Sequence, residues 1–96
     1  MTVAKAYEAD EMYTIEIEGH AGYNPGNDIV CSAVSTLIQT FAASAENHVG
    51  GSTIVACELG SGHAKVSIKG CSALYRSCVL GLTMIGNSYP DNLRVI

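Results

Sequence analysis

Apolar and polar residues alternate along residues 12–18, a pattern typical of a half-buried β-strand. The apolar side carries Tyr13, Ile15 and Ile17, and the polar side carries Thr14, Glu16 and Glu18. Residues 3–7 precede this segment across the polar turn 8–11, so the two predict a β-hairpin. A second hairpin is predicted from residues 53–59 and 64–69, which flank Gly60-Ser61-Gly62.

Two longer segments show the spacing of amphipathic helices. The first runs from Ile29 to about Val49 and is closed by Gly50-Gly51. Its predicted core stripe consists of Val30, Val34, Leu37, Phe41 and Ala45. The second runs from Cys71 to about Asn87, stops at Tyr89-Pro90 and precedes a last short strand at 93–96.

These elements follow the order β-β-α-β-β-α-β, and 96 residues allow only one core. We therefore expect a single α+β domain over residues 1–96, with a mostly antiparallel sheet and two helices on one of its faces. Hydrophobic residues make up 48% of the chain and charged residues 15%, which indicates a globular rather than a disordered protein.

The charge pattern excludes some classes of partner. The formal net charge is −4 and no cluster of Lys and Arg occurs, which disfavours direct nucleic-acid binding. No continuous apolar run has the length of a bilayer span, and the segment Met1–Lys5 lacks the apolar core of a signal peptide. A cytoplasmic protein without a membrane partner is the expectation.

The chain has four cysteines, and a reducing compartment and the absence of a C-x-x-C pair favour free thiols over disulfides or zinc. Cys57 alternates with Val55 and Leu59 on a predicted strand. Cys71 and Cys78 share one face of the second helix with Leu74, Leu82 and Ile85. These three thiols are predicted to be core residues. His48, in the last turn of the first helix, and His63, at a strand start, are interpreted as structural or solvent-facing.

The fourth thiol, Cys31, has a different setting. Asp28 is the predicted N-cap, which places Cys31 at the third helical position. Unpaired backbone N–H groups and the positive end of the helix dipole favour a thiolate there. His20 precedes it across a loop rich in Gly and Pro, so the pair fits a cysteine nucleophile with its general base. A structural helix-start cysteine and a solvated turn histidine are the alternatives.

The residues around this pair resemble the signature of the ribosomal-processing cysteine proteases called Prp. The matching strings are Gly19-His20-Ala21 and Gly26-x-Asp28-Ile29-Val30-Cys31-Ser32-Ala33-Val34-Ser35, followed by Tyr89-Pro90 and Asn92-Leu93-Arg94-Val95. Ser32 departs from the Ala that the family often has. The resemblance implies a homodimeric cysteine endopeptidase that uses Cys31 and His20. Its implied substrate is the N-terminal extension of a bacterial large-subunit ribosomal protein, cut after Phe-Phe and before Ala.

Two polar residues near the pair have candidate supporting roles. Asp28 is expected to cap the helix, and it could also orient His20 or position the substrate. Ser35 lies one turn beyond Cys31 and could hydrogen-bond near the thiolate or to its own helix.

The loop itself supplies further candidates. The Cys31 backbone N–H and one more donor are expected to form an oxyanion hole. The candidate donors, which are otherwise ordinary turn residues, are Gly19, Gly22 and Gly26. The segment 22–27 carries Tyr23 and is expected to be mobile until it closes over an extended peptide.

The second helix has a further apolar stripe opposite its core face, formed by Ala73, Leu80 and Met84 with Ser77 between them. This stripe predicts a homodimer, with scattered surface hydrophobes as the alternative. Two other function classes stay open: an inactive peptide-binding or assembly module, and a thiol hydrolase or transferase acting on small molecules. No metal or organic cofactor is implied, because no further ligand pair accompanies His20 and Cys31.

Overall fold

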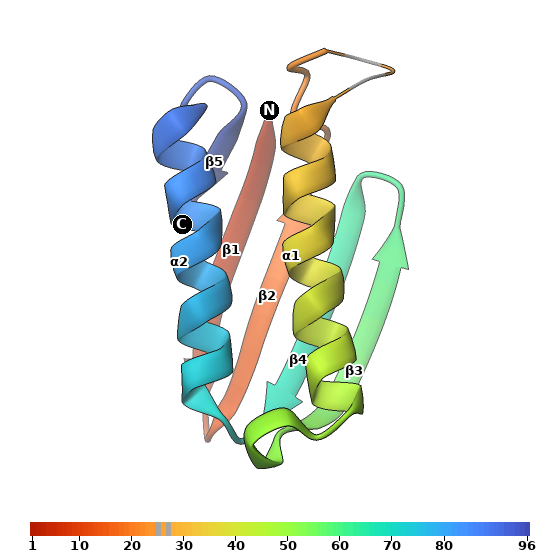
Figure 1. The fold of residues 1–96 in the computed structure, drawn as a ribbon, viewed down its shortest axis with the longest axis vertical. Coiled ribbons are helices and arrows are strands. Elements are labelled where there is room, and N and C mark those ends of the chain that lie inside the picture. The colour runs from red at the N-terminus through yellow and green to blue at the C-terminus, as the bar shows by residue number, and fades with distance from the viewer. Residues whose placement is uncertain (25, 27) are drawn as a thin grey trace.

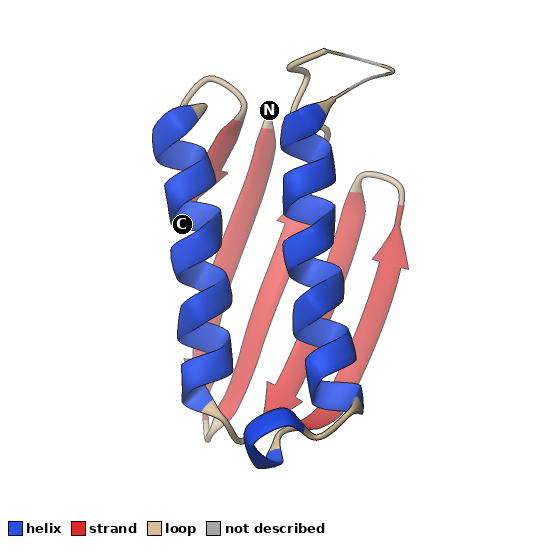
Figure 2. Ribbon diagram, in the orientation of Figure 1, coloured by secondary structure: helices blue, strands red, loops and turns tan. Residues whose placement is uncertain are grey.

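The chain forms one five-stranded sheet covered on one face by two long helices, in a computed structural model that describes all residues except 25 and 27 (Figures 1 and 2). The elements are β1 (Thr2–Ala9), β2 (Met12–Glu18), α1 (Ile29–Glu46), the 3₁₀ turn η1 (Val49–Gly51), β3 (Thr53–Gly60), β4 (His63–Lys69), α2 (Ser72–Ser88) and β5 (Leu93–Val95). The strand order is β3-β4-β2-β1-β5, and only the pair β1–β5 is parallel. The predicted α+β fold is confirmed.

The first hairpin shows how the alternating pattern orients the sheet. Asp10 and Glu11 join β1 to β2 with positive φ angles of 52° and 64°, as the tightest hairpin turns require. The resulting register points Ile15 and Ile17 toward the helices, where they are buried. On the opposite face, the Thr14 and Ser67 hydroxyls form a hydrogen bond of 2.8 Å between β2 and β4.

The buried stripe of α1 lacks one predicted residue, Leu37, and contains two that were not predicted, Ile38 and Ala42. Its buried residues are Val30, Val34, Ile38, Phe41, Ala42 and Ala45. Leu37 is only partly buried because it faces α2, where a Cβ added to Gly81 would lie 3.0 Å from Leu37 Cδ1. The absence of a side chain at Gly81 therefore lets the two helices approach closely.

The helix also ends earlier than predicted. α1 stops at Glu46, and His48 adopts a left-handed conformation with φ 57° before η1 begins. His48 therefore lies outside the last helical turn, and its Nδ1–H donates to the Ser52 carbonyl at 3.0 Å. By length and composition alone α1 could cross a membrane, contrary to our expectation for this chain. Its buried side chains pack instead on the sheet, as those of a core helix do.

The prediction that Cys57 is a core residue is wrong. Cys57 pairs with the buried Val66 of β4, but β3 is an edge strand and all eight of its residues are exposed. Val55 and Leu59 are 48% and 51% exposed. Figure 1 shows that β3 is the outer strand of the sheet, with a neighbouring strand on one side only. Alternation indicates which side chains share a face, whereas burial depends on where a helix lies.

The other two thiols that were predicted to be core residues, Cys71 and Cys78, differ in burial. Cys78 is buried as predicted, and burial raises the pKa of its thiol. Cys71 is only partly buried because it caps the helix instead of belonging to it, with φ 51°. Its sulfur packs where a Cβ on Gly50 would collide with it, so the chain requires glycine at that position.

Candidate active site

A cleft of about 200 Å³ opens between the first turns of α1 and the turn that joins β3 to β4. Cys31 and Ser35 line it from α1, His20 lines it from the segment after β2, and Gly62 lines it from the turn. The structure therefore brings the two predicted catalytic side chains into one cleft. Apolar side chains of Val34, Ile38 and Leu59 form part of its wall.

Asp28 caps α1 as predicted and also holds the preceding loop. Its Oδ1 accepts the N–H groups of Val30 and Cys31, each at 3.0 Å, and its Oδ2 accepts the Tyr23 N–H at 2.9 Å. These backbone donors, the Cys31 N–H foremost, hold the pKa of the Asp28 carboxyl below its ordinary value. Within the described residues Asp28 makes no hydrogen bond to His20, so its capping role is the one that the contacts support.

The sulfur of Cys31 has a hydrogen-bond donor that sequence reasoning missed. The Ala21 backbone N–H donates to Cys31 Sγ at 3.2 Å, and Cys31 itself is half-buried. A donor directed at sulfur stabilises the thiolate more than the thiol. The type of a residue does not show where its backbone N–H points. The sequence signal for this donor was the position of Ala21 directly after His20.

His20 is exposed and lies over the β3–β4 turn. A Cβ added to Gly62 would lie 2.8 Å from His20 Nε2, so the ring packs directly on this glycine. Among the described contacts, none is a hydrogen bond between His20 and Cys31. Catalytic hydrogen bonds commonly tighten only when substrate binds, so the shared cleft is the relevant geometry.

Two of the predicted oxyanion donors have other partners in this structure. The Cys31 N–H already donates to Asp28, and the Gly19 N–H donates to the Gly62 carbonyl at 2.8 Å. Gly19 is required structurally, because its φ is +90° and a Cβ would lie 2.6 Å from the Met1 carbonyl oxygen. Gly22 and Gly26, with φ +69° and +92°, are not among the described residues that line the cleft.

The outer part of the loop packs on the end of α2. The ring of Tyr23 meets that of Tyr89 edge to face, with 5.3 Å between centroids, and Tyr23 is not among the described residues that line the cleft. The predicted mobility of the segment 22–27 includes residues 25 and 27, which lie outside the described residues. Ser35 lines the cleft, and the described hydrogen bonds include none from its hydroxyl to its own helix.

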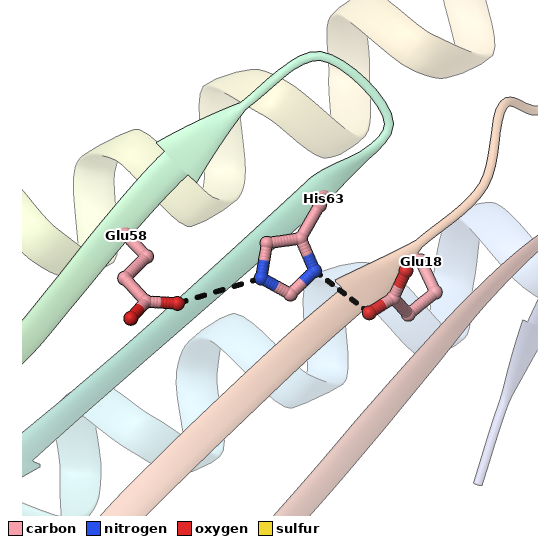
Figure 3. A network of polar contacts seen from close by, with 3 residues as sticks. All are labelled: Glu18, Glu58 and His63. Atoms are coloured by element: carbon pink, nitrogen blue, oxygen red, sulfur yellow. Dashed lines mark hydrogen bonds and ion pairs between the residues drawn. The ribbon is translucent and has the colours of Figure 1, made fainter.

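A second polar cluster lies on the sheet face opposite the helices (Figure 3). His63 Nδ1 donates to Glu18 Oε1 at 2.7 Å, and its Nε2 lies 3.5 Å from Glu58 Oε2, which links β2, β4 and β3. The Glu18 carboxylate, followed by that of Glu58, raises the pKa of His63 above its ordinary value. The solvent-facing interpretation of His63 is confirmed, and within the described residues no group of three His, Cys, Asp or Glu side chains could hold a metal ion.

Comparison with known families identifies this arrangement. The family model described as cysteine protease Prp matches residues 1–94. The chain belongs to the cysteine protease Prp family. The predicted resemblance to the Prp family is thereby confirmed, and the chain is a cysteine protease.

Solved structures share the Prp fold at low sequence identity. The ribosomal processing protease Prp of S. aureus with a covalently linked product peptide is 18% identical, with a TM-score of 0.80 and coverage of 99% of this chain and 97% of that chain. The same protease with a substrate peptide is 18% identical, with a TM-score of 0.75 and coverage of 100% and 98%. SMU.848 from Streptococcus mutans is 24% identical, with a TM-score of 0.73 and coverage of 99% and 91%. No curated protein matches the chain.

Proposed function

We propose that this Prp protease hydrolyses a peptide bond with Cys31 as nucleophile and His20 as general base. The observation that carries the proposal is the shared cleft, which is lined both by a half-buried thiol with a backbone donor on its sulfur and by an imidazole. Of the other thiols, Cys57 and Cys71 are absent from the described cleft lining and Cys78 is buried among core side chains.

The proposed reaction has two halves. His20 accepts the Cys31 proton, and the thiolate attacks the carbonyl carbon of the scissile bond. His20 then donates this proton to the departing amine, which leaves a thioester on Cys31. In the second half His20 deprotonates a water molecule, which attacks the thioester and releases the new carboxylate and the thiol.

We further propose that the substrate is the N-terminal extension of a bacterial large-subunit ribosomal protein, cut after Phe-Phe and before Ala. One protein of the same fold, from S. aureus, is described as a ribosomal processing protease in two structures, with a bound product peptide and with a bound substrate peptide. In this chain, the apolar wall of Val34, Ile38 and Leu59 beside Cys31 suits an aromatic side chain next to the cut.

We also propose that the protease works as a homodimer in the cytoplasm. Leu80 and Met84 on the outer face of α2 are 61% and 62% exposed, and Ala73 and Ser77 on the same face are exposed too. An apolar helix face of this kind is typical of a subunit contact. The four free thiols are compatible with a reducing compartment.

A peptide digest read by mass spectrometry tests the proposed activity. A synthetic peptide containing Phe-Phe-Ala should be cut between the second Phe and Ala by the wild type and by Cys57→Ser, whose exposed thiol is the matched control. Cys31→Ser should keep the melting temperature and lose cleavage. Binding without cleavage by the wild type would favour the inactive peptide-binding module, and full activity of Cys31→Ser would exclude Cys31 as the nucleophile.

A further inference from the structure

Ala21 is held at both of its backbone polar groups. Its N–H donates to Cys31 Sγ at 3.2 Å, and its carbonyl oxygen accepts from Asn92 Nδ2 at 3.0 Å. The residue is 2% exposed, so it cannot move without breaking packed contacts. Asn92 lies 71 residues further along the chain, in the turn between α2 and β5.

The backbone of Asn92 is itself fixed. Its N–H donates to the Tyr89 carbonyl at 3.0 Å, and its carbonyl accepts the N–H of the buried Thr2 in β1 at 2.9 Å. Figure 1 shows the turn after α2, the N-terminal end of β1 and the start of α1 at the same end of the molecule. The Asn92 amide therefore reaches Ala21 from a rigid base.

The N-terminus of α1 stabilises a thiolate at Cys31 less than the position of Cys31 in the helix suggests. The N–H groups of Val30 and Cys31 donate to Asp28, whose negative charge opposes that of a thiolate. The titratable residues near Cys31 are Asp28, which caps its helix, and His20 and His63, which line the same cleft. The Ala21 N–H is the backbone donor that the structure directs at the sulfur.

We propose that Asn92 is a positioning residue of this protease: by fixing Ala21, it keeps the Ala21 N–H on the Cys31 sulfur and favours the thiolate. The inference rests on the proposed role of Cys31 as the nucleophile. Asn92 acts through Ala21 and touches neither the sulfur nor the substrate.

The pH profile of Cys31 alkylation tests this role without any peptide substrate. Iodoacetamide labelling followed by peptide mapping gives the rate at Cys31 separately from that at the exposed Cys57. In Asn92→Leu, which keeps the size of the side chain but cannot donate, the midpoint of the profile should rise by about one pH unit. The rate at high pH should stay unchanged, because the thiolate is then fully formed. Asn87→Ala, an exposed asparagine of α2, is the matched control and should leave the midpoint in place.

A measurement on the wild type tests the same role if Asn92→Leu does not fold. The amide proton resonance of Ala21 should shift with pH at the same midpoint as Cys31 alkylation, since its acceptor changes from thiol to thiolate. An Ala21 resonance that does not move, or a lowered melting temperature of Asn92→Leu with an unchanged alkylation midpoint, would overturn the proposal. Absence of peptide cleavage with the expected pH profile would instead count against the proposed function.

Discussion

Substitution of Gly62 by alanine should reduce catalysis as well as stability, because the added side chain displaces His20. Gly62 lies in the β3–β4 turn at φ +72°, and an added Cβ would lie 2.8 Å from His20 Nε2 and 3.3 Å from Cε1. Ordinary van der Waals contact begins at 3.4 Å, so the difference from 2.8 Å forces the ring to retreat by at least about 0.6 Å. His20 is exposed and can retreat toward solvent at little cost in folding free energy.

The substitution should have one effect on stability and another on catalysis. An alanine in the left-handed region should lower the free energy of unfolding by about 1–2 kcal/mol. For a chain of this length, this corresponds to a melting temperature lower by about 4–8 °C per kcal/mol. Displacing His20, the proposed general base, by a large fraction of an ångström should reduce kcat/KM by roughly ten- to a hundredfold.

Gly51→Ala is the matched control. Gly51 has φ +79°, nothing lies within 4 Å of its hypothetical Cβ, and it ends η1 at the opposite end of α1 from the cleft (Figure 1). Both variants should lose similar amounts of stability in thermal melts, whereas only Gly62→Ala should lose kcat/KM on a fluorogenic Phe-Phe-Ala peptide. Equal kcat/KM for the two variants would refute the reasoning that the turn holds His20 in its working position.

Two further predictions concern the outer surfaces. Leu80→Glu should convert the proposed dimer to a monomer in light scattering after gel filtration, whereas Asn87→Glu, also exposed on α2, should not; a wild type that is already monomeric at tens of micromolar would contradict this. Because contact with Glu18 raises the folded-state pKa of His63 above 6.5, its stabilisation should be fully present below pH 6.5 and lost as pH rises through the folded-state value. His63→Gln should therefore melt lower than the wild type at about pH 5.5 and match it at about pH 8.5, and the same difference at both pH values would count against the ion pair.

Features set by neighbouring residues were predictable from the sequence. The apolar face of β2 and the Asp28 cap depend on residues a few positions apart, and the structure has both, although Thr14 on the other face of β2 is buried as well. Cys57 and Cys78 carry the same side chain in similar apolar patterns, yet only Cys78 is buried. Their difference arises because Cys57 lies on an edge strand whose residues are all exposed, whereas Cys78 packs in the core, and this is decided by packing between elements far apart in sequence.

The same distinction, between features set by nearby residues and features set by the fold, applies to the candidate site. His20 and Cys31 were recognisable because imidazole and thiol are distinctive chemical groups in a recognisable loop, and they do share a cleft. The donor on the sulfur was not recognisable, because any residue except proline supplies a backbone N–H and only the fold decides where it points.

The fold also decides which groups stabilise a thiolate at Cys31, the proposed nucleophile. A helix N-terminus stabilises an anion through free N–H groups, but Asp28 occupies those of Val30 and Cys31 and holds the loop through Tyr23. The Asp28 cap thus reduces the stabilisation that the N-terminus of α1 would give to a thiolate at Cys31. The donor that remains on the sulfur belongs to Ala21, which the turn before β5 anchors through Asn92. If the proposal holds, the reactivity of Cys31 should depend on the packing of the turn that carries Asn92, 61 residues further along the chain.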